Sequence, residues 1–215
     1  MNSIIKPWPF RGWGIDIIDQ IHPPSSKGHK FIVVAMDYFT KWDEVIPLKT
    51  VTSQNMIDFV QEHIIYQFGV PQTITTDQGT MFISEFENFV NNTRFKLLNS
   101  SPYYTQANGQ AEAYNQTLIK LIKKKIIDRP RKWHLTLNES LWAYQMACYG
   151  STKCSPYKLV YGHTAILPWE IRTRSRCIEF QKSLTADDYK VLMMDDLEDL
   201  NCHRLRALET SRLTS

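Results

Sequence analysis

Three acidic residues in separate segments of the chain have the side chains and local settings that metal-dependent chemistry requires. Asp16 lies within an apolar run of strand type, Asp77 directly follows a run rich in β-branched residues, and Glu112 begins an apolar pattern of helical spacing. A carboxylate in a buried strand is costly unless a cation or a hydrogen-bond donor is near. Because Mg²⁺ and Mn²⁺ prefer carboxylate oxygens, the three acids are candidate ligands of a divalent metal site.

A site of this kind suits phosphoryl transfer. Two ions about 3.5–4 Å apart stabilise the attacking and the leaving oxygen of an in-line displacement, and one helps to generate the nucleophile from water or a 3′-hydroxyl. We therefore expect Asp16, Asp77 and Glu112 to be both metal ligands and catalytic acids. The expected cofactors are two Mg²⁺ or Mn²⁺ ions, with no organic cofactor. Taken one at a time, each acid could instead cap a helix or form a turn.

Two other acids near these segments are weaker candidates. Asp37 ends a strand-like run and precedes a turn, so a turn-forming role is preferred for its side chain. Asp19 is three positions from Asp16 and therefore faces the opposite side of a regular strand. Neither is expected to be a metal ligand.

The hydrophobic pattern predicts elements that could bring the three acids together. Strands are expected at residues 12–21, 30–37, 42–48, 73–76 and 95–98, and helices at 53–68, 84–91, 109–128 and 131–147. Ser53 is the expected N-cap of the first helix. Antiparallel strands followed by a β-α-β unit give an α/β protein with a mixed five-stranded sheet flanked by helices. This is the order of the RNase H-like fold.

Seven short sequence motifs, in their order and spacing, resemble those of the catalytic core of a retroviral-type integrase. The resemblance is strongest to the integrase of gypsy-type LTR retrotransposons. The motifs are Trp8 to Asp16, Asp37 to Trp42, Phe68 to Pro71, Thr76 to Thr80, Ser101 to Tyr104, Asn108 to Ala113 and Ser155 to Gly162. The resemblance covers roughly residues 6–170. One departure is the interval from Asp77 to Glu112, which holds 34 residues, one fewer than the family pattern.

The resemblance implies a function for the whole site. Asp16, Asp77 and Glu112 would be the acids of a polynucleotidyl transferase that trims a DNA 3′ end and joins that end to target DNA. Element ends and target DNA would be its partners, a homo-oligomer its working form, and the nucleus its location. Two alternatives stay open: an RNase H-like nuclease that cuts without joining, and a catalytically silent, element-derived DNA-binding or assembly protein.

DNA contacts are expected on the loop before Glu112 and along the helix that Glu112 begins. The loop is polar and contains glycine, and the run 120–132 has seven cations against one acid. The alternative is local packing for the loop tyrosine and a solvated helix face for the lysines. The candidate DNA-binding residues are Tyr103, Gln106, Asn108, Gln116, Lys120, Lys123 and Lys124.

Composition limits the other function classes. The chain of 215 residues is 43% hydrophobic and 12% aromatic, which favours a folded core, and its formal net charge is only +3. No apolar run approaches the length of a membrane span, so no membrane partner is expected. The expected domains are an N-terminal extension (1–10), an integrase-like core (11–170) and an acidic helical tail or linker (171–215). We expect the chain to be an excised core, a fragment of a polyprotein or a host-retained remnant of an element.

Overall fold

The computed structural model describes residues 8–18, 21–76, 85–99, 119–150, 152–166 and 185–213. They fall into two compact units, residues 1–145 and 146–214. The predicted domain boundary at residue 170 lies outside the described ranges and stays a prediction. None of the described helices is long and apolar enough to cross a membrane.

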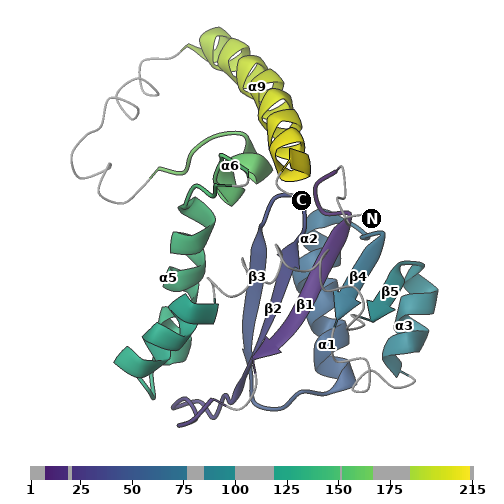
Figure 1. The fold of residues 1–215 in the computed structure, drawn as a ribbon, viewed down its shortest axis with the longest axis vertical. Coiled ribbons are helices and arrows are strands. Elements are labelled where there is room, and N and C mark those ends of the chain that lie inside the picture. Colours follow the sequence, from purple (N-terminus) through teal and green to yellow (C-terminus); the bar gives the residue numbers. More distant parts are fainter. Residues whose placement is uncertain are drawn as a thin grey trace. The chain divides into compact units, whose positions relative to one another are not determined.

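The first unit is built on one mixed sheet of five strands in the order β3-β2-β1-β4-β5 (Figure 1). Its strands are β1 (Gly12–Ile18), β2 (Phe31–Asp37), β3 (Asp43–Leu48), β4 (Thr73–Thr76) and β5 (Lys96–Asn99). β1, β2 and β3 pair antiparallel, whereas β4 pairs parallel with both β1 and β5. The mixed five-stranded sheet predicted from the sequence is therefore confirmed.

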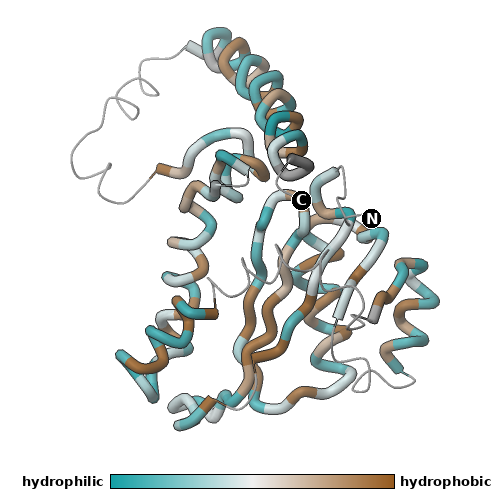
Figure 2. The backbone as a smooth tube through the Cα atoms, viewed as in Figure 1, coloured by the Kyte–Doolittle hydropathy of each residue, from teal (hydrophilic) through white to brown (hydrophobic). Residues whose placement is uncertain are grey.

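Apolar side chains explain why β1 and β2 lie at the centre. Trp13 in β1 and Ile32, Val33 and Met36 in β2 have no exposed surface, and apolar residues are concentrated in these strands (Figure 2). Such continuous burial is typical of strands covered on both faces. Every residue of β1 is buried except Asp16, which is half-buried.

The predicted helix at 53–68 forms in three consecutive pieces. They are α1 (Ser53–Phe59), the π-helical segment η1 (Val60–Ile65) and α2 (Tyr66–Phe68). The N-cap is Thr52 rather than the expected Ser53, because the Thr52 hydroxyl accepts a hydrogen bond from the Asn55 N–H (3.2 Å). α1 lies behind the sheet in Figure 1 and contacts α3 (Glu85–Thr93), which leads into β5.

Two further helical segments of the first unit follow β5 in the chain. Residues 119–128 are helical, in agreement with the described part of the predicted helix 109–128. After a turn at 129–132 comes α5 (Trp133–Met146), and Gln145 near its end donates a side-chain hydrogen bond to the Asp43 carbonyl of β3 (2.9 Å). Trp133, Leu137 and Tyr144 are the buried apolar residues that anchor α5.

The second unit contains α6 (Pro156–Tyr161) and α9 (Ala186–Leu213). Buried Cys154, Leu159 and Ala207 form its small apolar core. Arg204 of α9 donates hydrogen bonds to the carbonyls of Leu159 (3.0 Å) and Val160 (3.3 Å), which are terminal carbonyls of α6. The acidic tail was therefore correctly expected to be helical, whereas α6 was not predicted.

Candidate active site

The parallel pairing of β1 with β4 positions the first of the three candidate acids. Gly14 lies opposite Thr75, and Ile15 lies opposite Thr76. Asp16 is the residue after Ile15, so it stands where the described β1–β4 ladder ends, at the carboxyl end of β4. Functional sites of α/β sheets commonly open at the carboxyl ends of parallel strands.

The Asp16 side chain is accessible and oriented. It is half-buried within an otherwise buried strand, and its Oδ1 accepts a hydrogen bond from the adjacent Ile17 N–H (2.8 Å). A carboxylate offers about four acceptor positions, so one such hydrogen bond occupies only part of its acceptor capacity. The chemistry of this donor fits a hard divalent metal.

The other members of the predicted trio lie outside the described residues. Asp77 follows Thr76 directly in the chain but belongs to the undescribed range 77–84, and Glu112 belongs to 100–118. The predicted DNA-binding residues Tyr103, Gln106, Asn108 and Gln116 belong to the same range. Their convergence with Asp16 therefore stays a prediction. Within the ranges that the structure describes, no group of three or more His, Cys, Asp or Glu side chains could hold a metal ion.

The described helical residues 119–128 have the amphipathic character that the sequence predicted for this stretch. Ile119 and Ile122 are buried, whereas Lys120, Lys123 and Lys124 are exposed. The three predicted DNA-binding lysines thus lie on the solvent side of the helix. This arrangement is required for phosphate contacts and is equally compatible with a solvated face.

Asp37 belongs to a separate, buried cluster with a structural role. Its Oδ2 accepts hydrogen bonds from the Thr40 N–H and hydroxyl (both 2.7 Å), and its Oδ1 accepts one from the Phe10 N–H (2.9 Å). The predicted turn-forming role is therefore confirmed. Burial raises the pKa of Asp37 to about 6, and burial lowers the pKa of neighbouring Lys41 to about 8.

Asp43 is the third charged residue of the cluster. It is fully buried, and neither of its carboxyl oxygens has a hydrogen-bond partner among the residues that the structure describes. Burial raises its pKa well above the usual range, although the nearby Lys41 opposes that shift. These groups are enclosed by protein, so they are not available as ligands at the surface.

Tyr38 is a neighbour of the candidate site that the sequence analysis did not select. A Cβ built on Gly14 would lie 2.8 Å from the Tyr38 hydroxyl oxygen, so the tyrosine ring covers the Gly14 position. Residues 14 and 16 share one face of the strand, because side chains alternate. Tyr38 therefore lies on the face to which Asp16 belongs. In the sequence, the feature that could have indicated such a neighbour is the glycine two positions before Asp16, which leaves room for a large side chain.

Comparisons with known proteins agree with this architecture. Residues 7–105 match the family described as integrase core domain. The chain is 30% identical over 170 residues to the Pro-Pol polyprotein of feline foamy virus, and 28% identical over 168 residues to a Transposon Tf2-3 polyprotein of Schizosaccharomyces pombe. These matches cover 78% and 76% of this chain. The chain spans only 14% and 12% of the two polyproteins.

A solved structure gives the same fold. The HTLV-2 integrase catalytic core domain in complex with magnesium, in its trimeric form, has a TM-score of 0.54 and 23% sequence identity. The match covers 70% of this chain and 95% of that one. The sheet order, the flanking helices and this likeness identify the RNase H-like fold of integrase catalytic cores. Residues 7–105 thus match the integrase core domain family, and the two polyproteins to which the chain is similar are of retroviral and retrotransposon origin.

Proposed function

We propose that this chain is the catalytic core of a retrotransposon integrase and that it transfers polynucleotidyl groups. In the first reaction, water attacks a phosphodiester near a DNA 3′ end and the distal nucleotides leave. In the second, the new 3′-hydroxyl attacks a phosphodiester of target DNA and displaces its 3′ oxygen. Each step forms one P–O bond and breaks another, so no redox partner is needed.

The observation that carries the proposal is the β1–β4 register. Its described part ends with Ile15 opposite Thr76, and each proposed aspartate is the next residue in sequence. We propose that Asp16 and Asp77 face each other beyond this pair and that Glu112 joins them from its helix. The half-buried position of Asp16 supports this role, because a metal ligand needs access to solvent.

The proposed site would hold two Mg²⁺ or Mn²⁺ ions, and the HTLV-2 relative was solved in complex with magnesium. Bound ions would supply charge stabilisation at the attacking and leaving oxygens. The protein's own work would be to position the carboxylates and to bind DNA through the loop and lysines predicted from the sequence. A homo-oligomer and a nuclear location complete the proposal.

The deciding experiment uses a labelled, branched DNA that mimics the joined product, because resolution of the branch is the reverse of joining. With Mn²⁺, the chain should release the joined strand and reseal the target strand, whereas Asp77→Asn and Glu112→Gln should abolish both products. Asp19→Asn is the matched control and should retain activity. Cleavage without resealing would favour a nuclease, and no product from the unmodified chain would favour a silent protein.

A further inference from the structure

A loop and a turn that are distant in sequence form one continuous surface in the first unit. The loop, residues 21–30, follows β1, and the turn, residues 129–132, precedes α5. The Ser26 N–H donates a hydrogen bond to the Arg131 carbonyl (2.7 Å), and the His29 ring lies 5.5 Å from the His134 ring. We call residues 21–30 and 129–132, together with Lys49, the loop–turn surface.

Exposed cations are concentrated on this surface. None of them has an ion-pair partner among the described residues. Lys49 and Lys27 are close enough to His29 to lower its pKa, after the larger effects of burial and of His134. Lys27 and Lys49 are therefore both near His29, and both are exposed to water. The exposed cations are Lys27, Lys30, Lys49, Arg129, Arg131 and Lys132.

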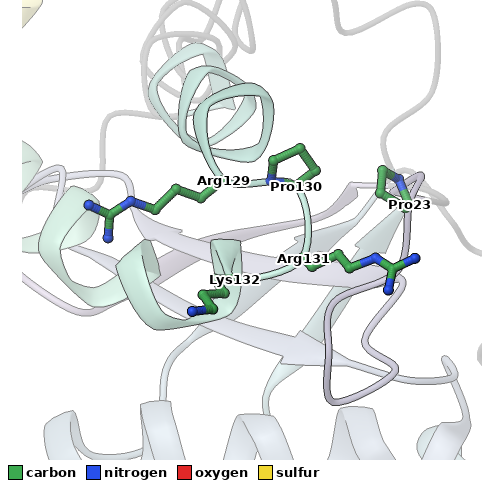
Figure 3. A pocket seen from close by; sticks show the side chains of 5 residues that line it. All are labelled: Pro23, Arg129, Pro130, Arg131 and Lys132. Atoms are coloured by element: carbon green, nitrogen blue, oxygen red, sulfur yellow. The ribbon is translucent and has the colours of Figure 1, made fainter.

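A shallow hollow of about 440 Å³ lies in this surface and is lined by Pro23, Arg129, Pro130, Arg131 and Lys132. Arg131 extends toward Pro23 across the hollow, whereas Arg129 and Lys132 extend to the other side (Figure 3). Proline rings beside guanidinium and ammonium groups match the alternation of sugar and phosphate in a nucleic-acid backbone. A single small anion would not need cations spread over two segments.

We propose that the loop–turn surface binds the phosphate backbone of duplex DNA beside the reacting phosphodiester. The proposal rests on the proposed function, and it adds Lys27 and Lys49 to the lysines predicted from the sequence. Pro23 is seven residues after Asp16, so the two Cα atoms are at most about 25 Å apart. At about 3.4 Å per base pair, a phosphate at Pro23 lies within roughly seven base pairs of the reaction site, and one at Lys27, eleven residues after Asp16, within roughly twelve.

Binding to a 30-base-pair duplex, measured by fluorescence anisotropy over a series of salt concentrations, tests the surface. Each lost phosphate contact should reduce the slope of log K against log salt by about 0.9. Lys27→Ala/Lys49→Ala should therefore flatten the slope by about 1.8 and weaken binding about 60-fold at 0.1 M salt. Both lysines are exposed, so the melting temperature should stay unchanged.

The matched control is Lys96→Ala/Lys190→Ala, which removes two exposed lysines, one at the amino end of β5 and one in α9. It should leave slope and affinity as they are. An unchanged slope in Lys27→Ala/Lys49→Ala, or an equal change in the control, would overturn the proposal. Protection of the duplex from hydroxyl radicals only beyond about twelve base pairs from the branch would also overturn it.

Failure of the proposed function gives a different result. If the unmodified chain does not bind duplex DNA at all, the integrase assignment fails and the loop–turn surface fails with it. If Lys120→Ala/Lys123→Ala flattens the slope while Lys27→Ala/Lys49→Ala does not, only the loop–turn surface is wrong. Loss of affinity confined to single-stranded oligonucleotides would reject the duplex as its ligand.

Discussion

Asp16 and Asp37 belong to neighbouring strands of one sheet, yet their carboxyl groups have different surroundings. Asp37 is fully buried, and its oxygens accept three hydrogen bonds from Phe10 and Thr40. Asp16 is half-buried in a strand that is otherwise buried. A carboxylate enclosed by donors uses its acceptor capacity within the fold, whereas one at the solvent boundary can serve a cation. Burial, more than motif membership, separates the structural acid from the catalytic candidate.

The substitution with the largest expected effect is Asp16→Asn, which tests whether Asp16 is a catalytic acid rather than a structural one. Loss of a carboxylate that ligates a catalytic metal removes several kcal/mol of transition-state stabilisation, so we expect turnover of branched DNA to fall at least about 1,000-fold. The free energy of unfolding should change by less than about 0.5 kcal/mol, because the site is half-buried and the amide keeps the size of the side chain. An active Asp16→Asn protein would remove Asp16 from the site.

Asp37→Ala should give the opposite pair of results. It would leave the buried Thr40 hydroxyl and the N–H groups of Thr40 and Phe10 without their acceptor. An unsatisfied buried donor costs about 1–3 kcal/mol, so the free energy of unfolding should fall by roughly 3–4 kcal/mol in urea titrations. Asp37→Asn keeps an acceptor oxygen and should lose less. A loss below about 1 kcal/mol would mean that Asp37 does not hold this turn.

The pH dependence of stability extends the comparison to the charge of the buried acid. The pKa of Asp37 is raised from 3.8 to about 6, so between these values the folded chain keeps a proton that the unfolded chain has lost. Stability should therefore fall by about 3 kcal/mol as pH rises from about 4 to 6. Buried Asp43 shifts in the same direction, so the measurement is the difference between the parent chain and Asp37→Asn.

Lys41 adds a second change to the dependence of stability on pH, at higher pH. Its pKa is lowered from 10.5 to about 8, so between these values the unfolded chain keeps the proton that the folded chain has lost. Its contribution to stability should therefore rise with pH from about 8 to 10.5, which places the minimum of the joint contribution of Asp37 and Lys41 between about 6 and 8. An Asp37→Asn protein whose stability still follows the parent between pH 4 and 6 would contradict the assignment to Asp37.

The sequence predicted the sheet better than it predicted the helices. β4 has the predicted bounds, because its β-branched run is short and ends at Asp77. Ile21, the expected last residue of β1, is outside the strand, although its N–H still donates to the Lys30 carbonyl (2.7 Å). Strand periodicity thus gave the pairing, and a local turn decided where regular pairing stops.

Two helical features could not be read from periodicity. The π-helical turn at Val60–Ile65 leaves the apolar pattern nearly as an α-helix would, so the spacing does not distinguish the two. α6 is only six residues long, but its start and stop signals are in the sequence: Ser155 caps it, Pro156 begins it, and Gly162 ends it in the left-handed region. Whether the three acids meet depends on how distant segments pair in the fold. For Asp16, the β1–β4 register supplies the structural support that the sequence alone could not give.

Gly14→Ala has the smallest expected effect. It tests whether packing beside Asp16 separates the structural part of the sheet from the catalytic part. The new Cβ would lie 2.8 Å from the Tyr38 hydroxyl oxygen and 3.1 Å from the ring carbon that carries it. The backbone of Tyr38 is held, because its N–H donates to the Gly12 carbonyl (2.9 Å) and its carbonyl accepts from the Lys41 ammonium (2.9 Å), so the ring itself must move to make room. We expect a loss of about 1–3 kcal/mol in the free energy of unfolding, as for other overpacked positions.

A double-mutant cycle with Tyr38→Phe identifies the cause of that loss. Removing the hydroxyl removes the nearest contact, so Gly14→Ala should cost less in the Tyr38→Phe background. Equal costs in both backgrounds would show that the strand, rather than Tyr38, resists the methyl group. Turnover of branched DNA adds the functional comparison, because Gly14 and Asp16 share one face of β1. If turnover falls while stability holds, the packing of Tyr38 on Gly14 positions Asp16, and the structural and catalytic parts of this sheet are coupled.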